Sequence, residues 1–263
     1  MIQPLAFVHP QAKIANTVVI EPFVTIHKDV EIDEGCWIGS NVTIMEGARI
    51  GKNCKIFPGA VISAIPQDLK FNGEETFVKI GNNVTIREFV TINRGTKANF
   101  ETVIGDHCLL MAYVHIAHDC ILGKNIILAN GATLAGHITI DDWAIVGGIT
   151  GVHQFVHIGA HSMIAGGCGV RKDVPPFTKA ARDPLSYSGI NSIGLRRRGF
   201  SHEKISEIQE IYRYIFLSKL NISQSVDLIE RELPATPERD EILSFIAHSS
   251  RGIMRGYSSN YIS

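Results

Sequence analysis

Residues 20–44 read IEPFVTIHKDVEIDEGCWIGSNVTI, and an isoleucine occupies every sixth position. The same spacing runs from Val8 to Val170, where 25 of 28 positions hold isoleucine, leucine or valine. The exceptions are Asp68, Glu74 and Ala98, in two stretches that we interpret as loops. A period of six fits neither the 3.6-residue repeat of an amphipathic helix nor the alternation of an ordinary strand. The sequence therefore indicates a repeat architecture.

A second, smaller side chain follows four residues after most of these positions, as at Val24, Cys36 and Ala48. Gly, Asn or Asp commonly fills the positions between, where tight turns are needed. Short strands joined by tight corners, each turning an aliphatic side chain inward, are typical of a parallel β-helix. Three such units give about 18 residues per triangular coil, with coils stacked at about 4.8 Å. Each buried aliphatic side chain then contributes about 1.5–3 kcal/mol.

All five cysteines fall at the smaller repeat position. They are Cys36, Cys54, Cys108, Cys120 and Cys168. Their odd number and the absence of Cys-x-x-Cys spacing argue against a disulfide framework and a zinc clip. We interpret them as small core residues with unreactive thiols, which favours a reducing, cytoplasmic location.

The overall charge excludes some classes of partner. The chain has 25 Lys and Arg against 26 Asp and Glu, so we expect no global field for nucleic acid or an anionic membrane. The N-terminus lacks a charged start followed by an apolar run, and no stretch approaches the ~20 apolar residues that span a bilayer. Neither a signal peptide nor a transmembrane segment is predicted.

The repeat divides the chain into parts. Residues 1–172 are predicted to form the β-helix, with loops near 64–78 and 97–103 where the aliphatic spacing lapses. Residues 173–200 are predicted to be a polar connector.

Residues 201–263 are predicted to form a C-terminal α-helical domain. Ser201 is a suitable N-cap for a first helix, Ser223 for a second, and Thr236-Pro237 opens a third with proline at the first helical position. The fold class is therefore mainly β, with an α-helical C-terminus.

Polar residues that the repeat does not need are the best candidates for function. Residues 18 apart should form columns along one edge of the prism, so His118 aligns with Gly136. One surface across three adjacent coils should carry His118, Asp119, Gly136, His137, His153 and Gln154.

An imidazole beside a carboxylate suits general-base catalysis, because the carboxylate orients the ring and stabilises its charged form. Gly136 could offer an unobstructed backbone N–H to a developing oxyanion. The cysteines point inward and no serine looks activated, so direct attack by a substrate hydroxyl is expected rather than a covalent intermediate.

Two other interpretations of the histidines remain. They could simply form hydrogen bonds at the corners of the coil. Alternatively, His118, His153 and His157 have separations roughly suited to zinc. Some trimeric proteins with this coil, resembling γ-class carbonic anhydrases, bind zinc with three histidines gathered across a subunit interface. The aspartate after His118 fits a base better, so no metal and no other cofactor is expected.

Five stretches closely resemble the UDP-N-acetylglucosamine O-acyltransferase family. They are 67–70 (QDLK), 115–120 (HIAHDC), 128–137 (LANGATLAGH), 151–155 (GVHQF) and 194–200 (GLRRRGF). The resemblance covers nearly the whole chain. It implies a homotrimer of left-handed parallel β-helices, although the general preference for right-handed crossovers would favour the opposite hand.

The resemblance also implies transfer of a 3-hydroxyacyl chain from acyl carrier protein to the sugar 3-hydroxyl. His118 would be the general base, Asp119 would orient it, and the Gly136 amide would stabilise the oxyanion. The implied substrate-binding residues are Gln67, Asp68, Lys70, His115, His137, His153, Gln154, Asn191, Arg197 and Arg198. The loop with Asp68 and Lys70 would reach the site from a neighbouring subunit.

Gly166 matches the family position whose side chain is implied to set the length of the acyl chain, the position called the ruler. A glycine there implies that a long acyl chain fits. The basic residues around Arg197 and Arg198 could bind an acidic carrier protein. Ile193 stands where the family pattern has an acidic residue, which puts one ribose contact in doubt. Transfer to a 3-amino sugar, the N-acyltransferase that acts later in lipid A assembly, a metal-dependent hydratase and a non-catalytic scaffold are the alternatives.

Overall fold

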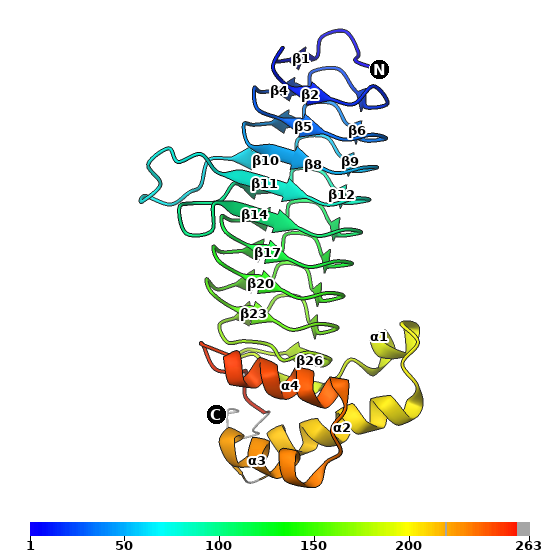
Figure 1. Ribbon diagram of the computed structural model, residues 1–263, viewed down its shortest axis with the longest axis vertical. Helices are drawn as coiled ribbons and strands as arrows, with labels where there is room; N and C mark the ends of the chain where they lie inside the picture. The colour runs from blue at the N-terminus through cyan, green and yellow to red at the C-terminus, as the bar shows by residue number, and fades with distance from the viewer. Residues whose placement is uncertain (219, 257–263) are drawn as a thin grey trace.

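The computed structural model describes residues 1–218 and 220–256. Short strands form three sheets, each of which lines one side of a triangular prism (Figure 1). Every pairing in the coil is parallel, and partners such as Phe7 and Thr25 lie one coil apart. The eighteen-residue coil predicted from the sequence is therefore confirmed.

Sheet 1 contains nine strands. They are β1 (Phe7–Val8), β4 (Thr25–Ile26), β7 (Thr43–Ile44), β10 (Val61–Ala64), β13 (Thr91–Asn93), β16 (His115–Ile116), β19 (Thr133–Leu134), β22 (Gly151–Val152) and β25 (Gly169–Val170). Sheet 2 contains eight strands. They are β2 (Lys13–Ile14), β5 (Glu31–Ile32), β8 (Ala48–Ile50), β11 (Phe77–Ile80), β14 (Glu101–Ile104), β17 (Ile121–Leu122), β20 (Thr139–Ile140) and β23 (His157–Ile158).

Sheet 3 contains ten strands. They are β3 (Val19–Ile20), β6 (Trp37–Ile38), β9 (Lys55–Ile56), β12 (Thr85–Ile86), β15 (Leu109–Leu110), β18 (Ile127–Leu128), β21 (Ile145–Val146), β24 (Met163–Ile164), β26 (Thr178–Ala181) and β27 (Ser186–Ile190). The chain visits sheets 1, 2 and 3 in turn, so the prism has three edges. We call them edge 1–2, edge 2–3 and edge 3–1 after the sheets they join.

The coil is left-handed. In Figure 1 the chain crosses the near face from left to right, turns behind the right-hand edge, and descends from the N-terminus. The expectation taken from the family resemblance is met, and the general preference for right-handed crossovers does not apply. That preference depends on strand twist, and strands of two residues accumulate little twist.

The aliphatic repeat forms the core. From Ile20 to Val170 its isoleucines, leucines and valines are all buried, and the smaller residues at the second repeat position are buried beside them. All five cysteines are buried and free. Burial raises the pKa of the Cys108 thiol to about 11 and that of Cys120 to about 12, which keeps both thiols protonated.

Both lapses in the repeat are loops that leave edge 1–2. The first spans 65–76, between β10 and β11, and the second spans 94–100, between β13 and β14. The second differs from the predicted 97–103, because Glu101 already pairs with Phe77 as the first residue of β14. In Figure 1 the first loop projects well beyond the body of the prism.

The predicted connector is more structured than expected. β26 extends sheet 3 beside β24, and β27 pairs with it in the antiparallel direction. A short helix, α1 (Ser192–Arg197), follows. The segment lacks the six-residue repeat, and for this reason its strands were not predicted.

Three helices cover the C-terminal end of the prism. They are α2 (His202–Phe216), α3 (Ile222–Glu232) and α4 (Pro237–His248). Ser201 and Thr236 are N-caps as predicted. The predicted cap at Ser223 is wrong, because Asn221 begins α3 with a complete capping box. Residues 257–263 of the predicted helical domain lie outside the described residues.

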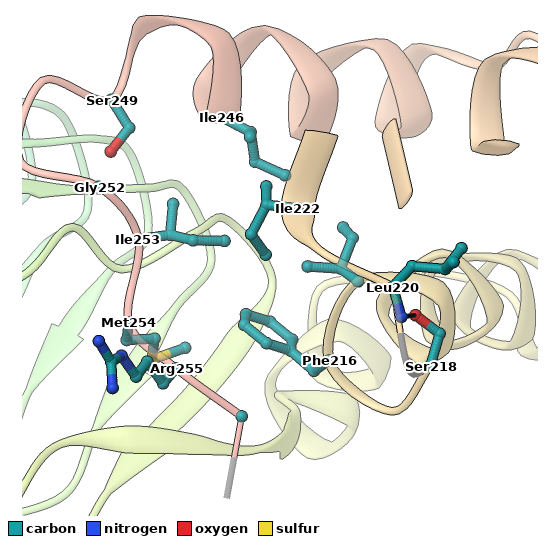
Figure 2. A pocket seen from close by; sticks show the side chains of 12 residues that line it. Phe216, Ser218, Leu220, Ile222, Ile246, Ser249, Gly252, Ile253, Met254 and Arg255 are labelled. Atoms are coloured by element: carbon teal, nitrogen blue, oxygen red, sulfur yellow. Dashed lines mark hydrogen bonds between the residues drawn. The ribbon is translucent and has the colours of Figure 1, made fainter. Parts of the chain in front are cut away.

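An apolar cavity of about 420 Å³ lies among these helices (Figure 2). Its lining comes from the end of α2, the start of α3, the end of α4 and the residues up to Gly256. None of the predicted site residues lines it. Within the described residues, no helix has the length and apolar character needed to cross a membrane.

Candidate active site

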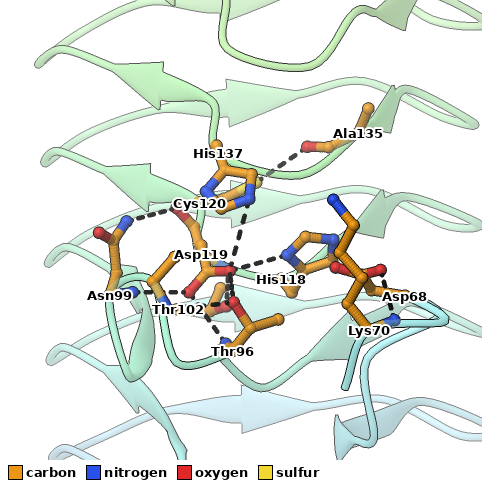
Figure 3. Close-up of polar contacts among 11 residues, drawn as sticks. Asp68, Lys70, Thr96, Asn99, Thr102, His118, Asp119, Cys120, Ala135 and His137 are labelled. Atoms are coloured by element: carbon orange, nitrogen blue, oxygen red, sulfur yellow. Dashed lines mark hydrogen bonds and ion pairs between the residues drawn. The ribbon is translucent and has the colours of Figure 1, made fainter.

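Edge 1–2 gathers the predicted catalytic residues. His118 and Asp119 form the corner between β16 and β17, and Gly136 and His137 form the corner one coil further on. The backbone N–H of His137 donates to the carbonyl of His118 at 3.0 Å, so the two corners are directly stacked. Figure 3 shows these side chains together on one surface.

His118 and Asp119 form a hydrogen-bonded pair. His118 Nδ1 lies 2.8 Å from Asp119 Oδ2. An ionised carboxylate can only accept, so Nδ1 carries the proton and Nε2 keeps a free lone pair. The imidazole side chain is 10% exposed and the carboxylate is fully buried. This is the tautomer that a general base at Nε2 requires.

The loop 94–100 completes the environment of Asp119. Thr96 donates its backbone N–H to Oδ1 at 2.9 Å and its hydroxyl to Oδ2 at 2.6 Å. The backbone N–H of Asn99 also donates to Oδ1, at 3.2 Å. Burial alone would raise the pKa of Asp119, but the hydrogen bonds from Thr96 and His118 outweigh it and lower the pKa. The carboxylate therefore stays ionised at neutral pH.

Gly136 lies directly against the His118 ring. A Cβ atom added to Gly136 would lie 2.6 Å from His118 Cε1 and 2.7 Å from Nε2. Among the described residues, the Gly136 N–H donates to no backbone or side-chain acceptor. A bare backbone donor beside the base is the arrangement that an oxyanion needs.

His137 and His115 flank the pair. The His137 ring is perpendicular to the His118 ring at a centroid distance of 5.0 Å and stacks on Phe155 at 4.7 Å. Burial lowers the pKa of His137, although Asp119 opposes this shift. Burial also lowers the pKa of His115, whose Nδ1 is 2.7 Å from the Thr91 hydroxyl. Both imidazoles are neutral at pH 7 and can form hydrogen bonds with substrate.

His153 and Gln154 occupy the next corner on the same edge. The His153 side chain is exposed, and its Nδ1 lies 3.1 Å from the Gln154 carbonyl oxygen. This position leaves Nε2 directed away from the backbone and free for a ligand on the edge.

The loop 65–76 of the same chain lies beside His118. Figure 3 places Asp68 and Lys70 next to it. The Asp68 carboxylate is close enough to His137 to offset part of the fall in the His137 pKa that burial causes. Asp68 Oδ1 accepts the Lys70 backbone N–H at 2.9 Å, which shapes the loop. Gln67 precedes them and is exposed. The implied approach of this loop from a neighbouring subunit therefore needs correction, since one chain already brings it to the site.

Asn93 and Arg94 anchor this loop, and neither is predicted as a site residue from the sequence. The Arg94 backbone N–H donates to the Ala64 carbonyl at 2.9 Å, and its guanidinium lies 5.6 Å from the centre of the Phe71 ring. Asn93 is buried, and its Nδ2 donates to the Ile65 carbonyl at 3.2 Å. Asn93 ends β13 and Arg94 begins the loop 94–100. The lapse of the aliphatic repeat after them was the feature of the sequence that could have identified both residues.

Three predicted substrate-binding residues lie away from His118. Asn191 is buried, caps α1 and donates its Nδ2 to the His161 carbonyl at 2.9 Å. Arg198 donates to the Trp143 carbonyl at 3.0 Å, and its guanidinium lies 5.2 Å from the centre of that indole. Arg197 is exposed beside it. His161 and Trp143 belong to edge 2–3, so one chain does not join these residues to the His118 cluster.

Edge 3–1 carries Gly166, which is exposed. A Cβ atom there would meet the Gly148 carbonyl oxygen at 3.0 Å. The same edge carries a column of exposed apolar side chains, namely Leu5, Phe23, Phe89, Tyr113 and Ile149. Phe89 and Tyr113 stack on each other at 5.3 Å. Such a column on a monomer surface indicates an interface.

Within one chain, His157 does not lie with His118 and His153, so the zinc alternative would need the interface between subunits and stays a prediction. His157 lies on β23, where its Nε2 is 2.8 Å from Asp141 Oδ2 and its ring packs on Phe245 at 4.5 Å. Within the described part of the chain, the one group of three metal-competent side chains is His118, Asp119 and His137.

Comparisons with known proteins identify relatives of the whole chain. Sequence models match for "Udp N-acetylglucosamine O-acyltransferase; Domain 2" at residues 173–254, for "Bacterial transferase hexapeptide (six repeats)" at 101–136 and for "GMPPB C-terminal domain" at 2–67. A protein from Janthinobacterium sp. (strain Marseille) is named acyl-(acyl-carrier-protein)–UDP-N-acetylglucosamine O-acyltransferase. It is 47% identical over 97% of this chain and 99% of its own length.

Solved structures give the same result. The chain matches LpxA, a UDP-N-acetylglucosamine acyltransferase from Bacteroides fragilis 9343, at 51% identity and a TM-score of 0.95. That match covers 97% of this chain and all of the other. The UDP-N-acetylglucosamine acyltransferase of Francisella novicida matches at 40% identity and a TM-score of 0.95, over 100% of this chain and 97% of its own.

Proposed function

Because the chain belongs to the UDP-N-acetylglucosamine O-acyltransferase family, we propose that it transfers an (R)-3-hydroxyacyl chain from acyl carrier protein to the 3-hydroxyl of UDP-N-acetylglucosamine. This reaction is the first step of lipid A biosynthesis. The observation that carries the mechanism is the tautomer of His118, whose Nδ1 is held by a buried carboxylate while Nε2 faces the Gly136 backbone.

His118 is the general base. Its Nε2 takes the proton of the sugar hydroxyl as the oxygen attacks the thioester carbonyl, and Asp119 stabilises the imidazolium that forms. The Gly136 N–H stabilises the tetrahedral oxyanion. When the C–S bond breaks, the imidazolium returns the proton to the departing phosphopantetheine thiolate. No covalent enzyme intermediate and no cofactor is needed, because the acyl donor arrives already activated as a thioester.

The other residues of edge 1–2 bind substrate. Gln67, Asp68 and Lys70 would hold the sugar nucleotide from the loop 65–76. His115, His137, His153 and Gln154 would line the sugar and thioester site. Their placement around His118 on adjacent coils supports this assignment.

The active unit is a homotrimer in this proposal. Asn191, Arg197 and Arg198 lie toward edge 2–3 and Gly166 lies on edge 3–1, so a single chain cannot bring them to a substrate at His118. Neighbouring chains would supply these edges, with Arg197 and Arg198 holding the nucleotide or the phosphopantetheine end. The exposed apolar column on edge 3–1 supports such packing. We also propose a cytoplasmic location, which agrees with the five free buried thiols.

The function is tested by incubating the purified protein with UDP-N-acetylglucosamine and a panel of 3-hydroxyacyl carrier proteins. We expect O-acylated product and a strong preference for one chain length. Parallel reactions with the 3-amino sugar nucleotide distinguish N-transfer. If only the amino sugar gave product, the proposed acceptor would be contradicted. If neither sugar gave product, the proposed function would be contradicted.

Arg94→Ala is expected to raise the KM for UDP-N-acetylglucosamine about fivefold, since loss of the guanidinium contact with the Phe71 ring, worth about 1 kcal/mol, loosens the loop 65–76. The KM for the acyl carrier protein and the melting temperature should change little. Arg87→Ala is the control, because Arg87 also stacks on a phenylalanine (Phe57, at 4.5 Å) but lies on edge 3–1, away from that loop. An equal rise in both variants would remove this role from Arg94.

Gly166→Met is expected to shift the preference to shorter acyl chains, because the new side chain would fill space that an extended chain occupies. The readout is the ratio of turnover numbers across the donor panel with the acceptor saturating. An unchanged chain-length profile in a correctly folded variant would exclude Gly166 as the ruler.

A further inference from the structure

One cluster on edge 1–2 combines metal-ligating groups in a way that the reaction itself does not require. His118, Asp119 and His137 each offer one ligand atom, and these three atoms lie within 4.8 Å of one another. The Asp119 Oδ2 atom is central, at 2.8 Å from His118 Nδ1 and 3.8 Å from His137 Nε2.

The three groups are well suited to a first-row transition metal ion. Two imidazoles and a carboxylate form a donor set that zinc commonly takes, with bond lengths of about 2.0–2.2 Å. At tetrahedral angles two ligands of one zinc ion lie about 3.4 Å apart on that basis. The widest separation in the cluster therefore needs to close by about 1.4 Å, and His137, whose side chain is 18% exposed, is the member with room to move.

The surroundings support the ligands from outside. Thr96 and Asn99 donate hydrogen bonds to the Asp119 carboxylate, and Phe155 stacks on His137 at 4.7 Å. Such outer contacts orient ligands and strengthen metal sites.

We propose that His118, Asp119 and His137 form an inhibitory binding site for Zn²⁺ and related divalent transition metals. A metal bound at His118 Nδ1 replaces the proton that now points to Asp119, and the neutral ring keeps its single proton on Nε2. A metal bound at Nε2 occupies the lone pair directly. In both cases Nε2 can no longer accept the proton of a substrate hydroxyl, so the metal-bound form is inactive. The inhibition rests on the proposed function, whereas the binding does not.

The binding experiment uses Co²⁺ as a spectroscopic probe of the full-length protein freed of metal with a chelator. We expect one high-affinity Co²⁺ ion per chain by equilibrium dialysis, with the visible absorption bands of a tetrahedral Co²⁺ site. Zn²⁺ should displace this ion. His137→Gln and Asp119→Asn should each lose this ion. His153→Gln is the matched control, since it removes a histidine from the same edge and should keep the ion.

Circular dichroism shows whether each variant is folded. If Asp119→Asn is unfolded, His137→Gln still tests the site. Retention of the ion in His137→Gln, or its loss in His153→Gln, would overturn the site.

The inhibition experiment adds Zn²⁺ to the acyl-transfer assay. Turnover should fall by about 10²-fold or more, because the general-base contribution is lost, and excess chelator should restore it. Full turnover at Zn²⁺ concentrations that saturate the site would overturn the inhibitory role. A chelated enzyme with no transfer activity would instead contradict the proposed function, while the Co²⁺ stoichiometry would still test the site.

Discussion

His118→Ala is expected to lower the turnover number by about 10²–10⁴-fold, the usual contribution of a positioned general base. The loss should appear at saturating UDP-N-acetylglucosamine, because the proton transfer occurs in the chemical step. The KM values should change less. Turnover measured with the preferred acyl carrier protein, at several enzyme concentrations, provides the readout.

The variant should remain folded. Asp119 keeps its hydrogen bonds from Thr96 and Asn99, and the core repeat is untouched. His202→Ala is a suitable control, since His202 is an exposed residue at the start of α2 and should have no effect. Near-normal turnover in a folded His118→Ala protein would rule out the mechanism.

Gly136→Ala is expected to lower turnover by about 10²–10³-fold, comparable to the loss of an oxyanion donor. The new Cβ would stand 2.6 Å from His118 Cε1, which no side chain tolerates, so the imidazole must move away from the oxyanion position. The substitution therefore separates the base from the backbone N–H. Turnover and the affinity for UDP-N-acetylglucosamine should be measured together, because only the former should fall strongly.

Gly151→Ala is the matched control for this prediction. Gly151 lies on sheet 1 one coil beyond Thr133, and a Cβ atom there meets nothing within 4 Å. Its turnover should match that of the unmodified protein. If Gly136→Ala were equally active, Gly136 would have no part in the site.

The repeat explains why so much of the molecule could be predicted. A period of six places an aliphatic side chain inside in each short strand. Three such periods stack Gly136 against His118 and His137 against Asp119 in adjacent coils. Stacking depends only on counting residues, so the core, the coil length and the His118 cluster are readable without coordinates. The same counting does not bring His153 and His157 together within one chain, because His153 lies on an edge and His157 on a face.

Other features depended on contacts that no period describes. The bonds from Thr96 and Asn99 to Asp119, and those from Asn93 and Arg94 to the loop 65–76, come from segments where the repeat lapses. The position of that loop beside His118 of its own chain was likewise beyond the sequence analysis.

The amino-acid sequence by itself determined the coil, its core and the identity of the stacked polar residues, because each follows from a periodic burial of aliphatic side chains. Only the tertiary structure decided how the irregular segments close around Asp119, which nitrogen of His118 is left free, and which predicted residues lie on separate edges. The physical reason is that loops have no repeating apolar pattern, so specific hydrogen bonds and ring contacts select their conformation.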